Sequence, residues 1–160
     1  MDSDAGTPAY SLRAATQQDA AFIYGLRVAG LREYVVQIWG WDEADQAARF
    51  RAQFDPARYQ VVVVDGRDIG AVAVEWRSDE VFFADIEVGP AWRGRGLGTA
   101  IVGAVLAEAR RRGLPATLQV LKVNPARRLY ERLGFRVVEE TPTHYRMSTA
   151  GREPIEESVP

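Results

Sequence analysis

The sequence predicts a mixed α+β protein with about seven strands and about four helices. Short runs rich in β-branched residues, each bounded by turn signals, alternate with longer segments whose apolar residues recur at helical spacing. A glycine-rich loop at 94–98 also separates a run of strand composition from a helical pattern. With 160 residues, 47% of them apolar and 26% charged, the chain has the size and composition of one globular domain.

The first part of the chain predicts one strand followed by two helices. Residues 11–16 alternate weakly between apolar and polar side chains, which is typical of a strand. Thr16 is expected to cap the first helix, with Asp19 in the position that completes a capping box. Asp42 is expected to cap a second helix over residues 43–54.

The next three segments have strand composition. Residues 59–64 and 69–76 are joined at Asp65-Gly66, a turn signal, so we expect an antiparallel hairpin. Residues 81–88 form a third strand-like run. Apolar residues occupy both faces of these strands, which indicates a sheet covered on both sides.

The rest of the chain again alternates helix and strand signals. Apolar residues at helical spacing after the glycine loop predict a helix that Gly113 and Pro115 end. The expected elements after it are a strand at 117–123, a helix with Asn124 as N-cap, Pro125 in its first turn and Gly134 at its end, and strands at 135–138 and 143–147. We expect a disordered N-terminus at 1–10, a single domain at 11–148 and a loose C-terminal tail at 149–160.

Composition excludes several classes of function. A net charge of −2 gives no sign of a nucleic-acid partner. The chain has no cysteine and one histidine, so we expect no disulfide and no metal site. The acidic N-terminus lacks the apolar core of a signal peptide, and no apolar run reaches membrane-spanning length. We therefore expect a cytoplasmic protein without a membrane partner.

The loop Arg93-Gly94-Arg95-Gly96-Leu97-Gly98 is the most informative motif. A strand, a loop of glycines and a helix N-terminus together form an anion site, because bare amides and the helix dipole meet there. A Walker loop would need a lysine after the last glycine, and the dinucleotide fingerprint G-x-G-x-x-G misses by one residue. The pattern Arg/Gln-x-x-Gly-x-Gly/Ala of an acyl-CoA pyrophosphate loop matches at every defined position. A glycine-rich turn without a ligand is the alternative.

Three blocks carry a resemblance to a known family. They are Ile86-Glu87-Val88-Gly89-Pro90 leading into Arg93–Gly98, then Leu121–Phe135, and last His144-Tyr145-Arg146-Met147. In this order they resemble the GNAT superfamily of N-acetyltransferases, over about residues 11–148. A weaker likeness, at 31–34 and 39–43, is to a bacterial subgroup of poorly defined substrate. The resemblance implies a central, mostly antiparallel, twisted sheet flanked by the helices.

The resemblance also implies acetyl-CoA as co-substrate, without a metal. Backbone amides from Arg95 to Thr99 would hold the pyrophosphate, and the pantetheine would lie along the strand that ends at Val88. That arrangement needs a strand edge, which the family provides by splaying this strand from the next. The residues expected to bind the cofactor are Ile86, Val88, Arg93, Gly94, Arg95, Gly96, Leu97, Gly98, Thr99, Asn124, Ala126 and Tyr130.

Direct attack of an amine on the thioester needs a base and an acid. Glu87 is the first candidate for the base, Asp85 the second and Glu75 a weaker one, and the period of two puts Asp85 and Glu87 on one face of their strand. Ile86 and Val88 could face the cleft instead, with bulk water taking the proton. Tyr130 stands where the family has its general-acid tyrosine. Its place in an apolar helical stripe also predicts a packing role.

The acceptor side is less defined. The resemblance places Tyr34, Trp39, Trp41 and His144 near the acceptor, although the aromatic side chains would serve equally well in the core and His144 could be structural. A protein N-terminus, a lysine side chain, a polyamine, an amino acid and an aminoglycoside all stay open as acceptors. Dimers are frequent in the superfamily, so a homodimer is compatible with the sequence. A catalytically silent CoA-binding sensor or interaction module of the same fold is the alternative function.

Overall fold

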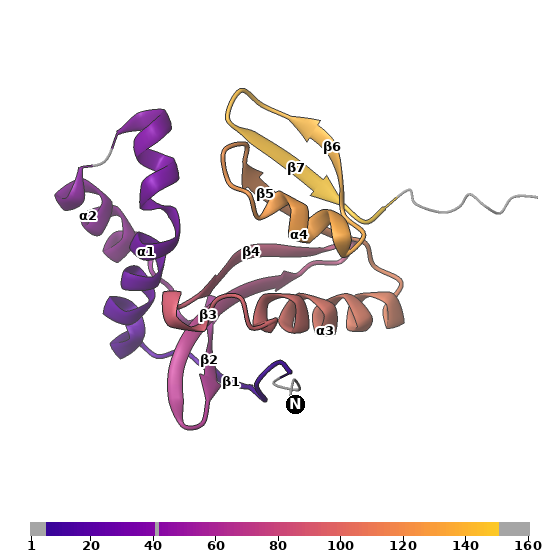
Figure 1. Cartoon of the computed structure of the whole chain (residues 1–160), viewed down its shortest axis with the longest axis horizontal. Helices are drawn as coiled ribbons and strands as arrows, with labels where there is room; N and C mark the ends of the chain where they lie inside the picture. Colours follow the sequence, from indigo (N-terminus) through magenta and orange to yellow (C-terminus); the bar gives the residue numbers. More distant parts are fainter. Residues whose placement is uncertain (1–5, 41, 151–160) are drawn as a thin grey trace, which may run out of the picture. The chain divides into compact units, whose positions relative to one another are not determined.

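The computed structural model describes residues 6–40 and 42–150, apart from several side chains between residues 31 and 39. Within this part of the chain, seven strands form one mixed sheet in the order β1-β2-β3-β4-β5-β7-β6, accompanied by four α-helices (Figure 1). β4 and β5 pair in parallel, whereas β1–β2, β2–β3, β5–β7 and β6–β7 pair antiparallel. The expected α+β fold with a mostly antiparallel sheet is confirmed.

The order of the elements is the one that the sequence predicts, with ends that differ by a few residues. The strands are β1 (Ser11–Ala14), β2 (Gln60–Val64), β3 (Arg67–Trp76), β4 (Val81–Val88), β5 (Ala116–Leu121), β6 (Arg136–Glu140) and β7 (His144–Ser148). The helices are α1 (Ala20–Trp39), α2 (Glu43–Gln53), α3 (Leu97–Arg111) and α4 (Arg127–Arg132). Short 3-10 turns lie at Gln17–Asp19, Pro56–Arg58 and Pro90–Trp92.

The predicted caps of the first two helices are present. Thr16 and Asp19 form the capping box of the 3-10 turn that leads into α1. α1 ends at Gly40, whose φ of +78° is a conformation that glycine adopts without strain. The Asp42 side chain accepts a hydrogen bond from the Asp45 amide at 3.0 Å and so caps α2.

The predicted start of α4 at Asn124 is wrong. The helix begins at Arg127, with Ala126 as its N-cap. Asn124 Oδ1 accepts a hydrogen bond from the Ala126 amide at 2.9 Å. This local turn satisfies the amide before the helix starts, because asparagine side chains bond the backbone two residues on as readily as they cap a helix.

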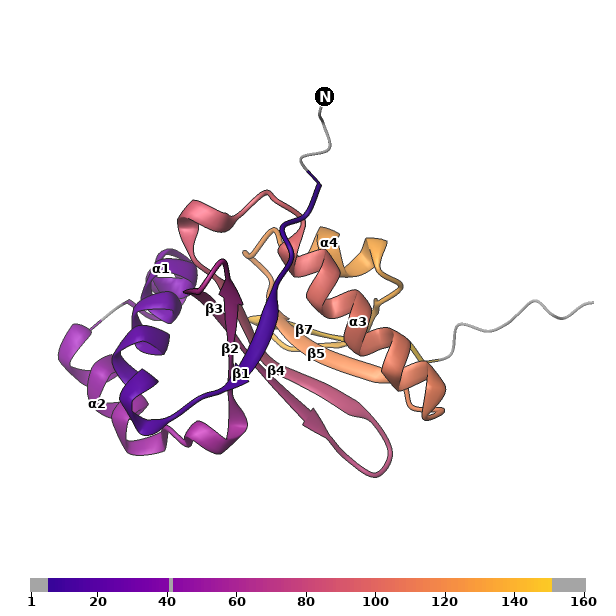
Figure 2. The same ribbon diagram turned by 90° about the horizontal axis from the view of Figure 1, so that it is seen from below.

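The chain divides into two compact units, and the first comprises residues 1–74 and 84–101. Ile23 and Leu26 of α1, Phe50 of α2 and Ala71 of β3 form one of its buried clusters. A second cluster joins β2 and β3 to the first turn of α3. In Figure 2, α1 and α2 accordingly lie on one side of these strands and the beginning of α3 on the other. The strands of this unit are covered on both faces, as predicted.

The second unit comprises residues 75–83 and 102–160. β5 pairs in parallel with Val81–Phe83 of β4 and antiparallel with β7. Phe135 is 2% exposed and lies edge-on to Phe83, with ring centroids 6.1 Å apart. Met147 of β7 is fully buried. This unit therefore has an apolar core of its own, built on β5 and β7.

Candidate functional site

A glycine loop connects the end of β4 to the start of α3. After Val88 the chain makes the 3-10 turn at Pro90–Trp92, passes Gly94 and Gly96, and enters α3 at Leu97. Gly94 has a φ of +75° and Gly96 a φ of +84°. This left-handed conformation is costly for residues with a Cβ atom, so the loop shape depends on glycine at both positions.

The first turn of α3 presents backbone amides beside this loop. Ala100 donates the first hydrogen bond of the helix, to the Gly96 carbonyl at 2.9 Å. The amides of Leu97, Gly98 and Thr99 therefore have no earlier carbonyl in the helix to bond. Leu97 is buried in the apolar cluster, whereas Thr99 is exposed. An anchored helical turn whose first amides have no earlier helix carbonyl to bond, with Thr99 exposed beside them, is chemically suited to a diphosphate group such as that of coenzyme A.

The two arginines of the loop hold defined positions. Arg93 donates from Nε to the Val88 carbonyl at 3.2 Å, which ties the loop to the end of β4. The Arg95 guanidinium lies over the Trp92 ring, 4.7 Å from its centroid. Both positively charged groups thus lie on the segment between β4 and α3, where they add to the electrostatic attraction for an anion.

Thr7 also contacts the loop. A Cβ atom added at Gly96 would overlap the Thr7 hydroxyl. Tyr10, three residues later, packs against the apolar cluster around Leu97. No local pattern predicts this contact, because residues 6–10 show neither a helical nor a strand period and meet the loop only in the folded chain.

Successive side chains of β4 point to opposite faces of the strand, and the two faces have different neighbours. Ile86 and Val88 pack against the apolar cluster that contains the first turn of α3. Asp85 and Glu87 share the other face, as the two-residue period of a strand requires, and this face is turned toward α1. The two candidate bases are thus neighbours on one side of the strand, and the apolar residues are on the other.

Glu87 occupies a confined position against α1. A Cβ atom added at Gly30 of that helix would overlap the Glu87 carboxylate. Burial raises the pKa of Glu87 to about 8, the charge of Asp85 and a hydrogen bond with it act in the same direction, and nearby guanidinium groups oppose the rise. A carboxyl group that titrates near neutral pH is suited to accept a proton from an amine.

Asp85 is the second buried carboxylate. Its side chain is 10% exposed, and its Oδ2 lies 3.5 Å from Nη1 of Arg27. That oxygen is buried and accepts no hydrogen bond from the described residues. Burial raises the pKa of Asp85, and the Arg27 charge opposes this. Burial also raises the pKa of Tyr59, whose hydroxyl bonds Asp85.

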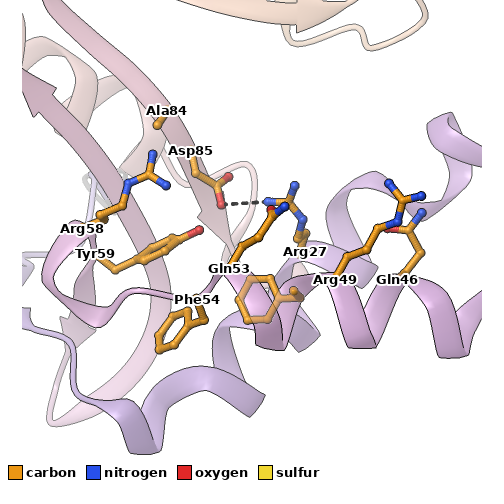
Figure 3. Close-up of a pocket in the computed structure, with 10 residues that line it drawn as sticks. Arg27, Gln46, Arg49, Gln53, Phe54, Arg58, Tyr59, Ala84 and Asp85 are labelled. Carbon is orange, nitrogen blue, oxygen red and sulfur yellow. Dashed lines mark ion pairs between the residues drawn. The ribbon is translucent and has the colours of Figure 1, made fainter.

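A pocket of about 340 Å³ lies within the first unit, beside Asp85 (Figure 3). α1 contributes Arg27, α2 contributes Gln46 and Arg49, and the segment after α2 contributes Tyr59. These four residues were not predicted from the sequence. Nothing in their local pattern marks them, and they meet β4 only through the tertiary fold.

Tyr130 lies on α4, in the second unit. It is half-buried, and its ring meets that of Phe135 edge-on with centroids 6.0 Å apart. The Phe135 amide donates to the Tyr130 carbonyl at 3.1 Å. The ring therefore packs in the way that the apolar stripe of this helix predicts.

The other predicted residues of the second unit are Asn124, Ala126 and His144. Asn124 and Ala126 form the turn before α4. His144 starts β7, and its Nδ1 lies 2.8 Å from the Thr143 hydroxyl. The His144 amide also donates to the Thr141 hydroxyl at 3.0 Å.

The predicted aromatic acceptor residues are Tyr34, Trp39 and Trp41. Tyr34 and Trp39 are part of α1, but their side chains lie outside the described ones. Trp41 lies outside the described residues altogether. These three assignments stay predictions.

Within residues 6–40 and 42–150, no three His, Cys, Asp or Glu side chains gather as a metal site would require. In the same part of the chain, no helix has the length and apolar character needed to cross a membrane.

Comparison with known proteins identifies a family. The family described as "Acetyltransferase (GNAT) family" matches residues 18–135. A curated relative, the [ribosomal protein bS18]-alanine N-acetyltransferase of Haemophilus influenzae, is 28% identical over 93 residues. The match covers 58% of this chain and 64% of the relative, so it spans less than two thirds of the relative's length.

Solved structures share the fold at low sequence identity. The PaiA N-acetyltransferase of Thermoplasma acidophilum, solved in complex with coenzyme A, has a TM-score of 0.70 at 12% identity, with 88% of this chain and 98% of that chain covered. An acetyltransferase of Thermus thermophilus has a TM-score of 0.68 at 17% identity, with 89% and 97% covered. At these identities, the likeness supports the fold.

Proposed function

The chain belongs to the GNAT family of acetyltransferases, and we propose that it is an N-acetyltransferase that moves an acetyl group from acetyl-CoA to a primary amine by direct attack, without a metal. The glycine loop at the start of α3 carries the proposal. Gly94 and Gly96 hold the loop in a left-handed conformation just before the first helical turn, whose amides have no earlier helix carbonyl to bond. When bound, acetyl-CoA supplies an acyl group already activated for transfer.

The donor is held mainly by backbone groups. The amides between Arg95 and Thr99 bind the diphosphate, and the Thr99 hydroxyl adds a hydrogen bond. β4 pairs with β5 over Val81–Phe83, and in this proposal the later residues of β4 offer their edge to the pantetheine amides. The Val88 amide donates to the thioester oxygen, where negative charge develops during acyl transfer.

Glu87 is the proposed general base. A protonated amine has no lone pair, and its usual pKa of about 10.4 makes a base useful at neutral pH. The high pKa of Glu87, caused by burial and by Asp85, matches this task. Asp85 acts beside it by keeping the proton affinity of Glu87 high.

Tyr130 is the proposed general acid. Its position seven residues after Val123, on the helix that follows Asn124-Pro125, corresponds to the tyrosine of the family motif. Its hydroxyl donates a proton to the leaving sulfur, while its ring keeps the packing against Phe135.

Two measurements test the proposal. Acetyl-CoA at millimolar concentration should raise the melting temperature, because a ligand that binds only the folded state stabilises it. The second measurement is the consumption of the acetyl-CoA thioester in the presence of each member of a broad panel of primary amines, and at least one amine should be acetylated. ATP serves as the matched control ligand, since it also offers a polyphosphate but lacks the pantetheine.

The outcomes separate the possible functions. The absence of a thermal shift with acetyl-CoA would count against donor binding. A shift without consumption of the thioester by any amine would favour a non-catalytic CoA-binding module. Tighter binding of ATP than of coenzyme A would point to a nucleotide-binding protein.

A further inference from the structure

The pocket beside Asp85 has a charge pattern of its own. Among the described residues, its lining includes three arginines, Arg27, Arg49 and Arg58, and one carboxylate, Asp85. The amides of Gln46 and Gln53 add further hydrogen-bonding groups. Arg27 pairs with Asp85 and Arg49 with Asp45, outside the lining. The described side chains of the lining still carry more positive than negative charge, which favours an anion.

α2 directs one face into this pocket. Gln46, Arg49 and Gln53 follow one another at spacings of three and four residues, which places them on the same side of the helix. Phe50 lies on that face as well and forms a floor with Phe54, the ring centroids being 5.4 Å apart. In Figure 3 the polar ends of Gln46 and Arg49 lie together, away from Asp85.

Arg49 keeps hydrogen-bonding capacity toward a ligand. Its side chain is 71% exposed, and its Nε pairs with Asp45 at 2.9 Å. A guanidinium has five N–H donors, so this ion pair leaves the Nη groups for a further anion. A carboxylate fits such a planar donor group better than a neutral oxygen does.

The opposite end of the pocket is lined by Asp85, a carboxylate that favours a positive charge beside it. Asp85 Oδ2 is buried without a hydrogen bond from the described residues, and the 3.5 Å to Arg27 Nη1 exceeds the usual length of a charged hydrogen bond. A buried carboxylate oxygen without a hydrogen bond is costly, and the positive charge of an ammonium group in the pocket beside Asp85 would offset this cost. Glu87, the proposed base, is the neighbour of Asp85 on the same face of β4.

We infer that the acceptor is a small primary amine that also carries a carboxylate, with its amine beside Asp85 and its carboxylate toward Arg49 and Gln46. The inference rests on the proposed function and names the substrate class of the same site. A volume of about 340 Å³ suits a small molecule. The two ends of the pocket have opposite requirements, so a molecule with only an amine would leave the α2 end without a partner.

Matched acceptor pairs test this inference. One pair is 4-aminobutyrate and 4-aminobutyramide, and the other is 6-aminohexanoate and 6-aminohexanamide. Within each pair the amine and the size are kept and only the negative charge is removed. Of 4-aminobutyrate and 6-aminohexanoate, one should be the better acceptor. We expect its kcat/KM to exceed that of the corresponding amide by about tenfold or more, since the amide cannot make the charge-assisted contact.

Two variants locate the contact on α2. Arg49→Gln should raise KM for the carboxylate about tenfold, with little change in kcat or in KM for the amide. Arg51→Gln is the matched control, because Arg51 is an exposed arginine of the same helix that does not line the pocket. It should leave both acceptors unchanged, and the thermal shift with acetyl-CoA should be the same in both variants.

The outcomes distinguish this inference from the proposed function. Equal kcat/KM values within each pair, or no consumption of any carboxylate-bearing amine, would overturn the inference. So would acetylation confined to peptide N-termini. Neither result affects the proposed function as long as some amine is acetylated. If no amine is consumed and acetyl-CoA gives no thermal shift, the proposed function itself is wrong.

Discussion

Replacing Glu87 by glutamine tests the chemistry of β4 most directly. Glutamine keeps the size of the side chain next to Gly30 but cannot accept a proton from an amine. We expect kcat/KM to fall by about a hundredfold or more, within the range that a positioned general base contributes. The wild-type rate should rise with pH toward about 8, the pKa of Glu87 in the folded protein, and the Glu87→Gln variant should lose this dependence.

The same pKa predicts how stability depends on pH. The ordinary value of the Glu87 carboxyl is 4.5, and the folded protein raises it to about 8. Between these values the folded state binds a proton that the unfolded chain does not. The contribution of protonated Glu87 to stability is therefore fully present below pH 4.5 and is lost as the pH rises through 8. The free energy of unfolding falls by about 1.4 kcal/mol per pH unit at most. Between pH 5.5 and 7.5 the total is about 2 kcal/mol, because the folded state already loses part of its proton near pH 8.

Chemical denaturation at pH 5.5 and 7.5 measures this difference. The free energy of unfolding of the wild type should fall relative to that of Glu87→Gln by about 2 kcal/mol between the two pH values. Glu139→Gln, which removes an exposed carboxylate on β6, is the control and should follow the wild type. A Glu87→Gln protein with the wild-type pH–rate profile and the wild-type pH dependence of unfolding would refute the reasoning.

Four further substitutions are predicted to separate binding, catalysis and packing. Gly30→Ala should lower kcat/KM, because its Cβ would overlap the Glu87 carboxylate. Gly25→Ala, on the same helix but with open space around it, should keep activity. Chemical denaturation should show a gain in stability of up to about 1 kcal/mol for Gly25→Ala. Gly96→Ala should abolish most of the thermal shift with acetyl-CoA, because position 96 has a φ of +84° and its Cβ would meet a side chain of residue 7; an undiminished shift would contradict this. Tyr130→Phe should lower kcat with little change in the thermal shift, and unchanged turnover would remove the hydroxyl from the mechanism.

The fold was predictable because its signals are local. The hairpin of β2 and β3 follows from β-branched runs on either side of Asp65-Gly66, and the cap of α2 follows from Asp42. The start of α4 was not predictable in the same way. Asn124 is compatible both with a cap and with a turn before the helix, and the side chain alone does not choose between them.

The candidate site was predictable only where it follows the chain continuously. The loop and the carboxylates of β4 are a single stretch of sequence, and a two-residue period places Asp85 and Glu87 on one face. Arg27 and Tyr59 reach Asp85 from distant segments of the chain, and the hydrophobic periodicity of the sequence does not predict such contacts. The raised pKa of Glu87 depends on burial by α1, which the sequence of β4 does not contain.

β4 links the two parts of the proposed chemistry in the first unit. Its apolar face packs with the first turn of α3, and its acidic face is turned toward α1. β3 holds the strand closely, since a Cβ atom at Gly70 would lie 2.6 Å from the Glu87 carbonyl and the Gly89 amide donates to the Ile69 carbonyl at 2.8 Å. A one-residue slip of β4 would bury the carboxylates among apolar side chains. Because the glycine loop starts where β4 ends, the close approach of β3 at Gly70 fixes the glycine loop and the acid pair together.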